Sequence, residues 1–350
     1  MRGAGALRGP GTLSRPGRRA AGRRAAGTTS RLSAPTGTLS RVRPALKSGL
    51  LPVWRDRDTL QIGIDPRRAV ALTGMRGAAW LIGLLDGSRD RAQVLAAAQD
   101  RGMPPHAVER VLALLAAGGA LDDFPAATLR ALPPSLRSPL AAELATASLA
   151  RGDSDGGASV LARRRAASVQ IYGTARIGAA IADILTAAGV GRVTCPAEGG
   201  FAAGQLPQPH LAVLTERQPP ELADRLMRER VPHLAASAAE AIGLVGPLVL
   251  PGETACLRCL DYTRADNDPA WPLILAQLAG RAPDPLGCDA ALTAAVAAQA
   301  AAQALTFLDR AMLAYAAVNG TLELVLPAWQ WRRRTWLPHR ACTCASHTPT

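Results

Sequence analysis

Four cysteines in two close pairs place the strongest constraint on how this chain can fold. Cys256 and Cys259 form a C-x-x-C motif, and Cys342 and Cys344 form a C-x-C motif after 82 intervening residues. Two such turns can aim four thiolates at one point, about 2.3 Å from each sulfur, which is the tetrahedral set that structural zinc prefers. We therefore predict a structural zinc site that closes a C-terminal α/β domain.

Other arrangements of these cysteines are disulfide bonds, a redox-active dithiol or unrelated buried thiols. Structural disulfides are rare in the cytosol, and the C-x-x-C follows a predicted strand and Pro251 instead of opening the helix of a thioredoxin-like unit. The remaining cysteines, Cys195 and Cys288, are expected to be small buried residues without a nucleophilic role.

The positive charge of the chain is concentrated at its N-terminus. The formal net charge is +13, and residues 1–47 contain 11 Lys and Arg residues with no Asp or Glu. This basic, Pro/Gly/Ser/Ala-rich segment has too little apolar surface to fold, so we predict a disordered tail. A start site assigned too far upstream would explain it equally well. The rest of the chain is nearly neutral, which argues against specific nucleic-acid binding.

No segment has the pattern of a secretory signal or a membrane span. The longest apolar stretch, residues 290–318, is interrupted by Gln299, Gln303, Asp309 and Arg310, so we predict an Ala-rich packed helix. We expect a cytoplasmic protein with no membrane partner.

Strands and helices alternate in the C-terminal half, residues 166–350. This alternation predicts a mostly parallel, Rossmann-like sheet covered by helices. The Gly-rich, polar sequence in residues 133–165 predicts a connector between this domain and an N-terminal one. The predicted strands are residues 168–172, 191–194, 211–214 and 244–250, and the predicted helices are 177–188 and 221–230.

A glycine-rich turn follows the first of these strands. Gly173, Ala175 and Gly178 occupy the positions of the G-x-G-x-x-G motif that receives a nucleotide phosphate. A methyl group at Ala175 obstructs the approach of a ligand to the backbone, and no acidic residue follows the next strand. We interpret the turn as a degenerate nucleotide site and expect it not to bind ATP.

The order of elements in residues 48–132 is three short strands followed by three helices. The strands are predicted at residues 53–55, 59–64 and 69–73, and the helices at 77–85, 91–99 and 106–116. This order predicts a winged-helix module. Its third helix carries Arg110 as its only cation, whereas a DNA-recognition helix needs several polar and basic groups.

The C-terminal residues from about 160 to 346 resemble the ThiF/MoeB family of ubiquitin-activating-type adenylyltransferases. The resemblance is carried by the glycine turn, the phrase Ala187-Ala188-Gly189-Val190-Gly191, the stretch from Gly246 to Gly252, and the two cysteine pairs. It implies a lysine that contacts ATP and an aspartate that binds magnesium. The only lysine here is Lys47, and Thr215 and Glu216 stand where the aspartate is expected, so we predict no catalytic residues.

The N-terminal module resembles PqqD-like peptide-recognition elements. That resemblance implies that a leader peptide adds a strand beside the third strand and packs along the third helix, with Val70, Leu72, Val108 and Leu112 as candidate contacts. The alternative is that these apolar residues are the core of the module, which we expect for about half of them.

Together the two halves resemble the leader-binding, ThiF-like partner of cyclodehydratases in thiazole/oxazole-modified microcin (bacteriocin) biosynthesis. This resemblance implies a precursor leader peptide, a separate YcaO-type modifying enzyme and a homodimer as partners. Two rival hypotheses are an ATP-dependent adenylyltransferase with a divergent site and a regulator whose winged helix binds DNA.

Overall fold

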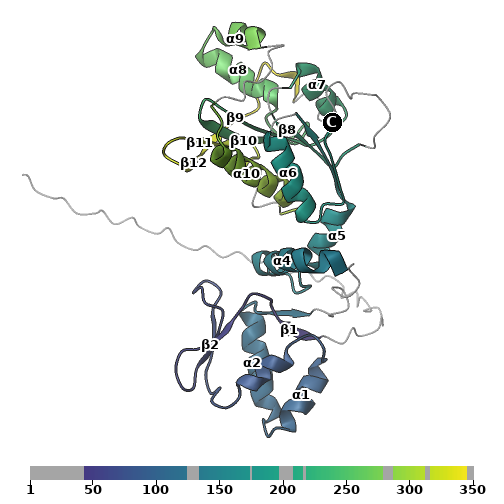
Figure 1. Ribbon diagram of the computed structural model, residues 1–350, viewed down its shortest axis with the longest axis vertical. Coiled ribbons are helices and arrows are strands. Elements are labelled where there is room, and N and C mark those ends of the chain that lie inside the picture. The colour runs from purple at the N-terminus through teal and green to yellow at the C-terminus, as the bar shows by residue number, and fades with distance from the viewer. Residues whose placement is uncertain are drawn as a thin grey trace, which may run out of the picture. The chain divides into compact units, whose positions relative to one another are not determined.

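The computed structural model describes residues 43–123, 134–173, 176–196, 208–215, 218–278, 287–311 and 316–344. The predicted disordered tail lies outside these residues up to position 42. The predicted β3α3 order of the N-terminal module is present. Figure 1 shows the two α-helices of this module.

The N-terminal module contains a three-stranded antiparallel sheet in the order β2-β3-β4, formed by Pro52–Trp54, Leu60–Ile62 and Val70–Leu72. A 3₁₀ helix, η1 (Ala79–Leu84), follows it, and then come α1 (Arg91–Gln99) and α2 (Pro105–Ala117). A reciprocal capping box between Asp90 and Gln93 starts α1, and Pro105 occupies the first turn of α2. The stripe Val108, Val111, Leu112 and Leu115 buries α2 in the core of the module.

The predicted tail is wrong at its C-terminal end, because residues 44–47 belong to the folded module. Strand β1 (Pro44–Leu46) pairs antiparallel with β5 (Leu121–Asp123). Lys47 is only 2 % exposed, and its Nζ lies 3.3 Å from Asp122 and donates to the carbonyl of Ser148 at 2.8 Å. A buried lysine needs such partners, and Ser148 lies 101 residues away in sequence.

Two helices form the connector, α4 (Pro134–Arg151) and α5 (Ala158–Ala166). Arg164 of α5 makes a bidentate pair with Asp309, with both N–O distances 2.9 Å, and also donates to Glu143 of α4 at 2.7 Å. Arg151 donates to the same Asp309 carboxylate at 2.8 Å. Burial alone would lower the pKa of Arg164, but Asp309 raises it above its usual value. The connector is therefore fixed by charged groups to the end of helix α10, which spans Ala290–Leu308.

The C-terminal domain is built on a seven-stranded mixed sheet with the order β12-β11-β10-β9-β8-β6-β7. The four strands β7, β6, β8 and β9 run parallel, which confirms the predicted arrangement around the glycine turn. Strands β10, β11 and β12 continue the sheet antiparallel. The bounds are β6 Ser168–Tyr172, β7 Arg192–Thr194, β8 Leu211–Thr215, β9 His233–Ala239, β10 Ile242–Val249, β11 Gly320–Val325 and β12 Gln330–Thr335.

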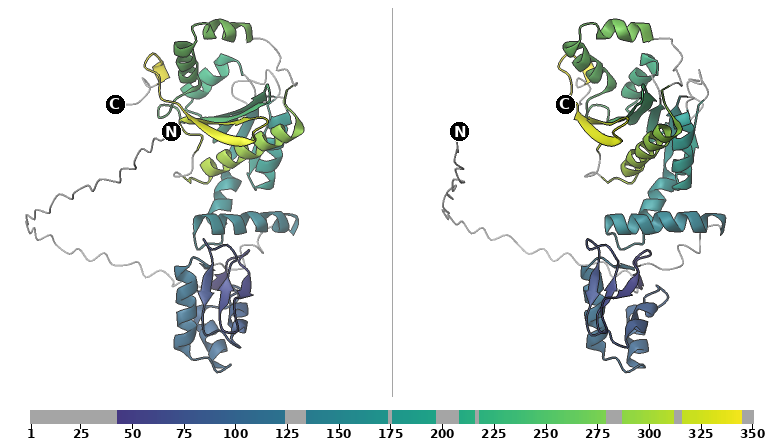
Figure 2. Two further views of the ribbon diagram at one scale, coloured as in Figure 1. Left: turned by 90° about the vertical axis from the view of Figure 1, so that its left-hand side faces the viewer. Right: turned by 60° about the vertical axis from the view of Figure 1, so that its left-hand side comes forward.

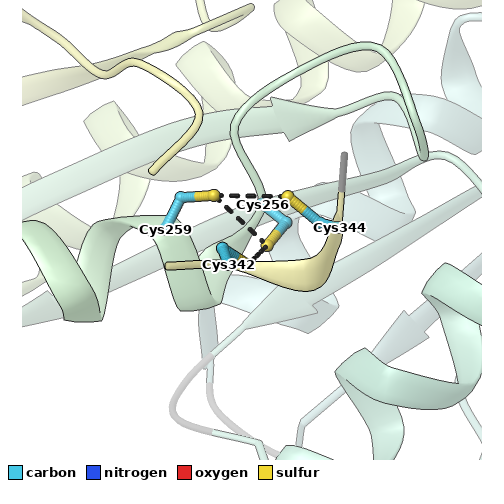
Figure 3. Close-up of side chains that lie close together, drawn as sticks. All are labelled: Cys256, Cys259, Cys342 and Cys344. Atoms are coloured by element: carbon cyan, nitrogen blue, oxygen red, sulfur yellow. Dashed lines mark hydrogen bonds between the residues drawn. The ribbon is translucent and has the colours of Figure 1, made fainter. Parts of the chain in front are cut away.

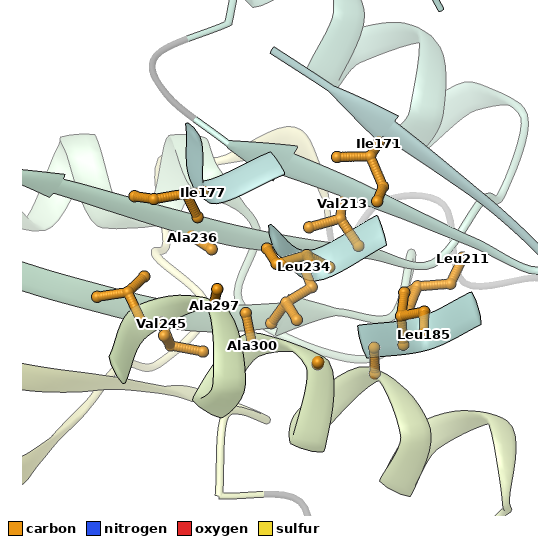
Figure 4. Close-up of a cluster of buried hydrophobic side chains, with 14 of the residues drawn as sticks. Ile171, Ile177, Leu185, Leu211, Val213, Leu234, Ala236, Val245, Ala297 and Ala300 are labelled. Carbon is orange, nitrogen blue, oxygen red and sulfur yellow. The ribbon is translucent and has the colours of Figure 1, made fainter. Parts of the chain in front are cut away.

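Helices cover both faces of this sheet (Figure 2). Helices α6 (Arg176–Ala187) and α10 (Ala290–Leu308) pack on one face against Ile171, Leu211 and Val213, in the cluster that Figure 4 shows. Helix α7 (Pro220–Arg228) and the start of α8 (Leu257–Asn267) cover the other face, against Ala212 and Leu214. Successive residues of β8 thus point into opposite apolar layers, which explains its continuous apolar sequence. The short helix α9 (Trp271–Leu278) follows α8.

Helix α10 is the one described helix that is long and apolar enough to cross a membrane. Nine of its residues are buried, and they include Val296, Ala297, Ala300 and Ala301 against the sheet. Small side chains let the helix approach the strands closely. The prediction of an Ala-rich packed helix is therefore confirmed for residues 290–308.

Asp309 is expected to be a stability determinant of the whole C-terminal domain. Its side chain is 3 % exposed and compensates two guanidinium groups, so Asp309→Ala leaves buried positive charge without a partner. We expect the free energy of unfolding in urea to fall by about 3 kcal/mol or more. The matched control is Arg258→Ala, which removes an exposed pair with Asp224 and should cost less than about 1 kcal/mol. Equal losses in the two variants would contradict this assignment.

Candidate metal centre and peptide-binding surface

The two cysteine pairs meet at one buried point. Cys256 is the N-cap of α8 and Cys259 lies in its first turn, while Cys342 and Cys344 follow β12 (Figure 3). The Sγ atoms of Cys256 and Cys259 are 3.7 Å apart, those of Cys256 and Cys342 3.6 Å, and those of Cys259 and Cys344 3.3 Å. All four sulfurs lie within 4.8 Å of one another.

These distances fit a metal-binding group and not a pair of disulfides. The sulfur–sulfur edge of a tetrahedral zinc site with bonds of about 2.3 Å is about 3.8 Å, whereas a disulfide bond is about 2.05 Å long. The structure therefore brings together all four predicted ligands in a donor set that suits a soft or borderline cation such as Zn²⁺.

Burial and mutual repulsion make four thiolates at this point unfavourable without a cation. Burial raises the pKa of the Cys256 thiol far above its usual value and raises that of Cys344 to about 12. Burial opposes ionisation of Cys259 as well, but the backbone N–H of His339, 3.3 Å from its Sγ, helps to lower the pKa of this thiol. Four thiolates at this point repel one another unless a metal ion neutralises them.

His339 supports this group through its backbone and not as a fifth ligand. Its Nε2 pairs with Asp266 at 2.9 Å, and its ring stacks on Tyr262 with the ring centroids 5.2 Å apart. The ring is thereby held so that the backbone N–H of the same residue points at Cys259. The buried Trp336 packs beside the cysteines and donates from Nε1 to Thr321 at 2.7 Å.

His233, at the start of β9, lines a cavity of about 210 Å³ beside the cysteines. Burial lowers its pKa to about 4, although its contact with the Val231 carbonyl acts in the opposite direction. The imidazole is therefore neutral at pH 7. This environment is that of a packed histidine and not of a general acid.

The other two cysteines behave differently from each other. Cys195 is exposed, so the expectation that it is buried is wrong, since it follows the short edge strand β7 and no described element covers it. Cys288 is half-buried, and its Sγ lies 3.2 Å from the Thr293 hydroxyl. Neither residue joins the four-cysteine group.

The glycine turn after β6 is packed closely against the next parallel strand. A Cβ at Gly173, where φ is +118°, would lie 2.3 Å from the carbonyl oxygen of Thr215. The Thr215 hydroxyl donates to the carbonyl of Tyr172 at 3.0 Å, so it occupies the position beside the turn with a neutral group. Gly178 is buried in α6, as its role in helix–strand packing predicts, and Ala175 lies outside the described residues.

Lys47, the single lysine of the sequence, has buried partners elsewhere in the chain and is not available to this turn. Lys47 is buried between Asp122 and the carbonyls of Ser148 and Asp153. Near the turn, Arg176 at the start of α6 donates to the carbonyl of Cys288 at 2.7 Å. The described residues therefore show no lysine that could contact a phosphate here.

The four predicted peptide contacts lie where β4 meets α2. Leu72, Val108 and Leu112 are buried in the core of the module, and Val70 is partly buried against it. These four side chains pack in or against the core of the module. Their contact with a peptide stays a prediction.

A residue of α2 that the prediction did not include is exposed. A Cβ at Gly118 would lie 2.2 Å from Val70, so the end of α2 rests directly on β4. Leu114 precedes Gly118 by one helical turn and is 44 % exposed. The signal was in the sequence, because Leu114 stands outside the apolar stripe of α2.

The fold and the cysteine group together define a mixed α/β domain with a largely parallel, Rossmann-like sheet, joined to a β3α3 module, which is the predicted fold class. No protein-family model matches the sequence, and no curated protein matches it. Solved structures match over most of the chain. A heterocyclase in complex with substrate and cofactor matches 86% of this chain with a TM-score of 0.62 and 18% sequence identity. The heterocyclase TruD matches 86% of this chain with a TM-score of 0.60 and 19% sequence identity. Escherichia coli MccB with AMPCPP and MccA has 0.58 at 13% over 87%.

These matches differ in how much of the other protein they cover. The chain spans 39% and 42% of the two heterocyclase chains, but 99% of MccB. At these identities the similarity establishes the fold alone.

The metal content of the purified protein tests the four-cysteine site. Protein purified reduced and without chelator should hold about one zinc per chain, and Cys342→Ser should lose most of it with a fall in melting temperature of about 10 °C. Elemental analysis and thermal melting provide the measurements. The matched control is Cys195→Ser, an exposed cysteine outside the group. Less than about one zinc per two chains in the wild type would count against the site.

Proposed function

We propose that this protein is a noncatalytic scaffold of ribosomal peptide biosynthesis of the thiazole/oxazole-modified, bacteriocin type. In this proposal the N-terminal module binds the leader of a precursor peptide, and the ThiF-like domain presents the peptide to a separate YcaO-type cyclodehydratase. We place the protein in the cytoplasm and expect it to form a homodimer.

The burial of Lys47 is the main observation in support of a noncatalytic role. An adenylyltransferase must neutralise the charge that develops on phosphate groups, and lysine and magnesium-bound aspartate are the groups that do so in the family this chain resembles. Here the only lysine is held by Asp122 in the other half of the chain, and a threonine stands beside the glycine turn. Arginine has a different geometry at a phosphate and is not an equivalent replacement.

The unpaired side of β4 supports peptide binding. Among the described residues β4 pairs with β3 only, so its other side offers main-chain groups to an added strand. Val70 and the exposed Leu114 would give such a strand apolar contacts beside α2. Main-chain hydrogen bonds would supply affinity, and these side chains would select apolar residues at alternate positions.

The heterocyclase matches bear on the choice of modifying enzyme. The chain spans 39% and 42% of the two heterocyclase chains. We propose that a separate YcaO-type protein corresponds to the part of those chains that this chain does not match. The four-cysteine group, with zinc bound, would then stabilise the scaffold and take no part in the chemistry.

The match to MccB favours a second candidate function, that of an ATP-dependent adenylyltransferase. This chain and MccB correspond over almost their whole lengths, and MccB has been solved with ATP. In this candidate a divergent set of groups around the turn would contact the nucleotide.

Two measurements separate these candidates. Purification of the full chain from its native cells, with mass spectrometry of whatever co-elutes, should recover a small precursor peptide and a YcaO-type protein. The purified protein should show no ATP–pyrophosphate exchange above background with that peptide. Exchange that depends on the peptide would overturn the scaffold proposal in favour of adenylation.

A substitution on α2 tests the peptide-binding surface. Leu114→Glu puts a carboxylate on α2 one turn before Gly118, which contacts β4, and it leaves the core undisturbed because Leu114 is exposed. We expect it to weaken binding of the co-purified peptide at least about ten-fold by fluorescence anisotropy. Leu337→Glu, at a leucine that is 72 % exposed in the C-terminal domain, is the matched control and should bind normally. Equal affinity of both variants would exclude this surface.

A further inference from the structure

A shallow, open cleft of about 510 Å³ lies in the N-terminal module, away from the four-cysteine group. Its lining consists of Trp54, Arg55, Asp56, Arg57 and Arg76, all of them exposed. The first four follow from the end of β2 into the turn before β3, and Arg76 follows β4. We call this feature the arginine cleft.

Hydrogen bonds hold the two loops of the cleft together. The backbone N–H of Met75 donates to the carbonyl of Asp58 at 2.9 Å, and that of Gly74 donates to the Asp58 carboxylate at 3.1 Å. The Asp56 carboxylate accepts from the backbone N–H groups of Asp58 and Thr59, both at 2.8 Å. The acidic side chains are thus engaged in building the turn.

The three arginines have no such engagement. Among the described residues Arg55, Arg57 and Arg76 form no ion pair within 4.0 Å. With Asp56, and with Asp58 whose carboxylate lies between the two loops, they leave an excess of one positive charge, three arginines against two aspartates, beside the half-exposed indole of Trp54. Guanidinium groups bind carboxylates with two parallel hydrogen bonds, and an indole face accepts apolar side chains.

The position of the cleft relates it to the open edge of β4. Trp54 pairs with Leu60, and Leu60 pairs with Leu72, so these three residues cross the sheet at one end. A strand added beside β4 that continues past Leu72 reaches the loop that carries Arg76. We propose that the arginine cleft binds acidic residues of the same peptide that adds to β4, directly next to its alternating apolar segment. This inference rests on the proposed function and adds that the peptide bound by the N-terminal module is acidic.

Nucleic acid is a less suitable occupant of the cleft. Binding to duplex DNA usually relies on roughly six to ten phosphate contacts, and the cleft offers three arginines. The adjacent helix α2 has Arg110 as its only basic residue besides His106. A short acidic peptide needs no more cations than the cleft supplies.

Selection from a random phage-displayed peptide library tests the inference on the full chain. The wild type should enrich peptides in which Asp or Glu residues flank alternating apolar residues. The triple variant Arg55→Gln, Arg57→Gln, Arg76→Gln should lose the acidic preference but keep the apolar one, and should bind a selected acidic peptide at least about ten-fold more weakly at low salt. Arg76→Gln alone should give an intermediate loss, with melting temperatures unchanged because the side chains are exposed.

The matched control removes three exposed arginines of the C-terminal domain, by Arg192→Gln, Arg332→Gln and Arg340→Gln, and should behave as the wild type. Apolar enrichment without acidic residues, or an acidic preference that survives in the triple variant, overturns the inference and leaves the proposed function intact. Failure to enrich any peptide overturns both. Binding of a short DNA duplex that only the triple variant loses, without acidic peptides, also overturns the inference.

Discussion

The convergence of four buried thiols is the constraint on which the C-terminal domain depends. Cys256 and Cys259 start helix α8, while Cys342 and Cys344 end the segment that leaves strand β12 at the sheet edge. Few apolar side chains share this cluster, so packing alone holds the end of the chain weakly. A metal ion bound to all four sulfurs would contribute the missing stability and fix α8 against the sheet. This structural role requires no catalytic chemistry from the four cysteines.

Charged groups perform a comparable task where the connector meets each half of the chain. Lys47 binds to Asp122 and to carbonyls at the end of α4, whereas Arg151 and Arg164 share Asp309 at the end of α10. Each of these charges is largely buried with its partner, and a buried pair is sensitive to geometry because either member alone is costly. The apolar contact between α4 and α5 is a small cluster of three leucines, Leu140, Leu144 and Leu161. The connector is therefore specified by a few polar contacts instead of a large apolar interface.

Local patterns predicted those parts of the fold in which neighbouring residues decide the structure. The β3α3 order, the βαβ start and the packed helix α10 follow from apolar periodicity and from turn residues. The four cysteine ligands were predictable because the chemistry of two close pairs is specific. Strand β10 was expected to continue the parallel sheet, but it forms a hairpin with β9. Its two-residue turn, Glu240-Ala241, has φ values of +54° and +60° without the Asn or Gly that normally indicates such a turn.

Long-range partners account for most of what the sequence could not predict. The strand at residues 44–46 and the burial of Lys47 depend on β5 and α4, which no local pattern around residue 47 indicates. The exposure of Leu114 and the joining of Arg76 to the Trp54 turn likewise depend on tertiary contacts.

Charged residues are distributed differently in the two halves of the chain. The lysine that a nucleotide site of the ThiF type would need is absent from the described surroundings of the glycine turn, while arginines gather around Trp54 on the N-terminal module. This distribution supports the proposal that the N-terminal module recognises an anionic partner. In that proposal the sheet, the helical layers and the cysteine group of the C-terminal domain serve stability and assembly. One fold can carry different functions, so the function of this chain must be argued from its charged groups and surfaces and not from the fold it shares with the solved structures.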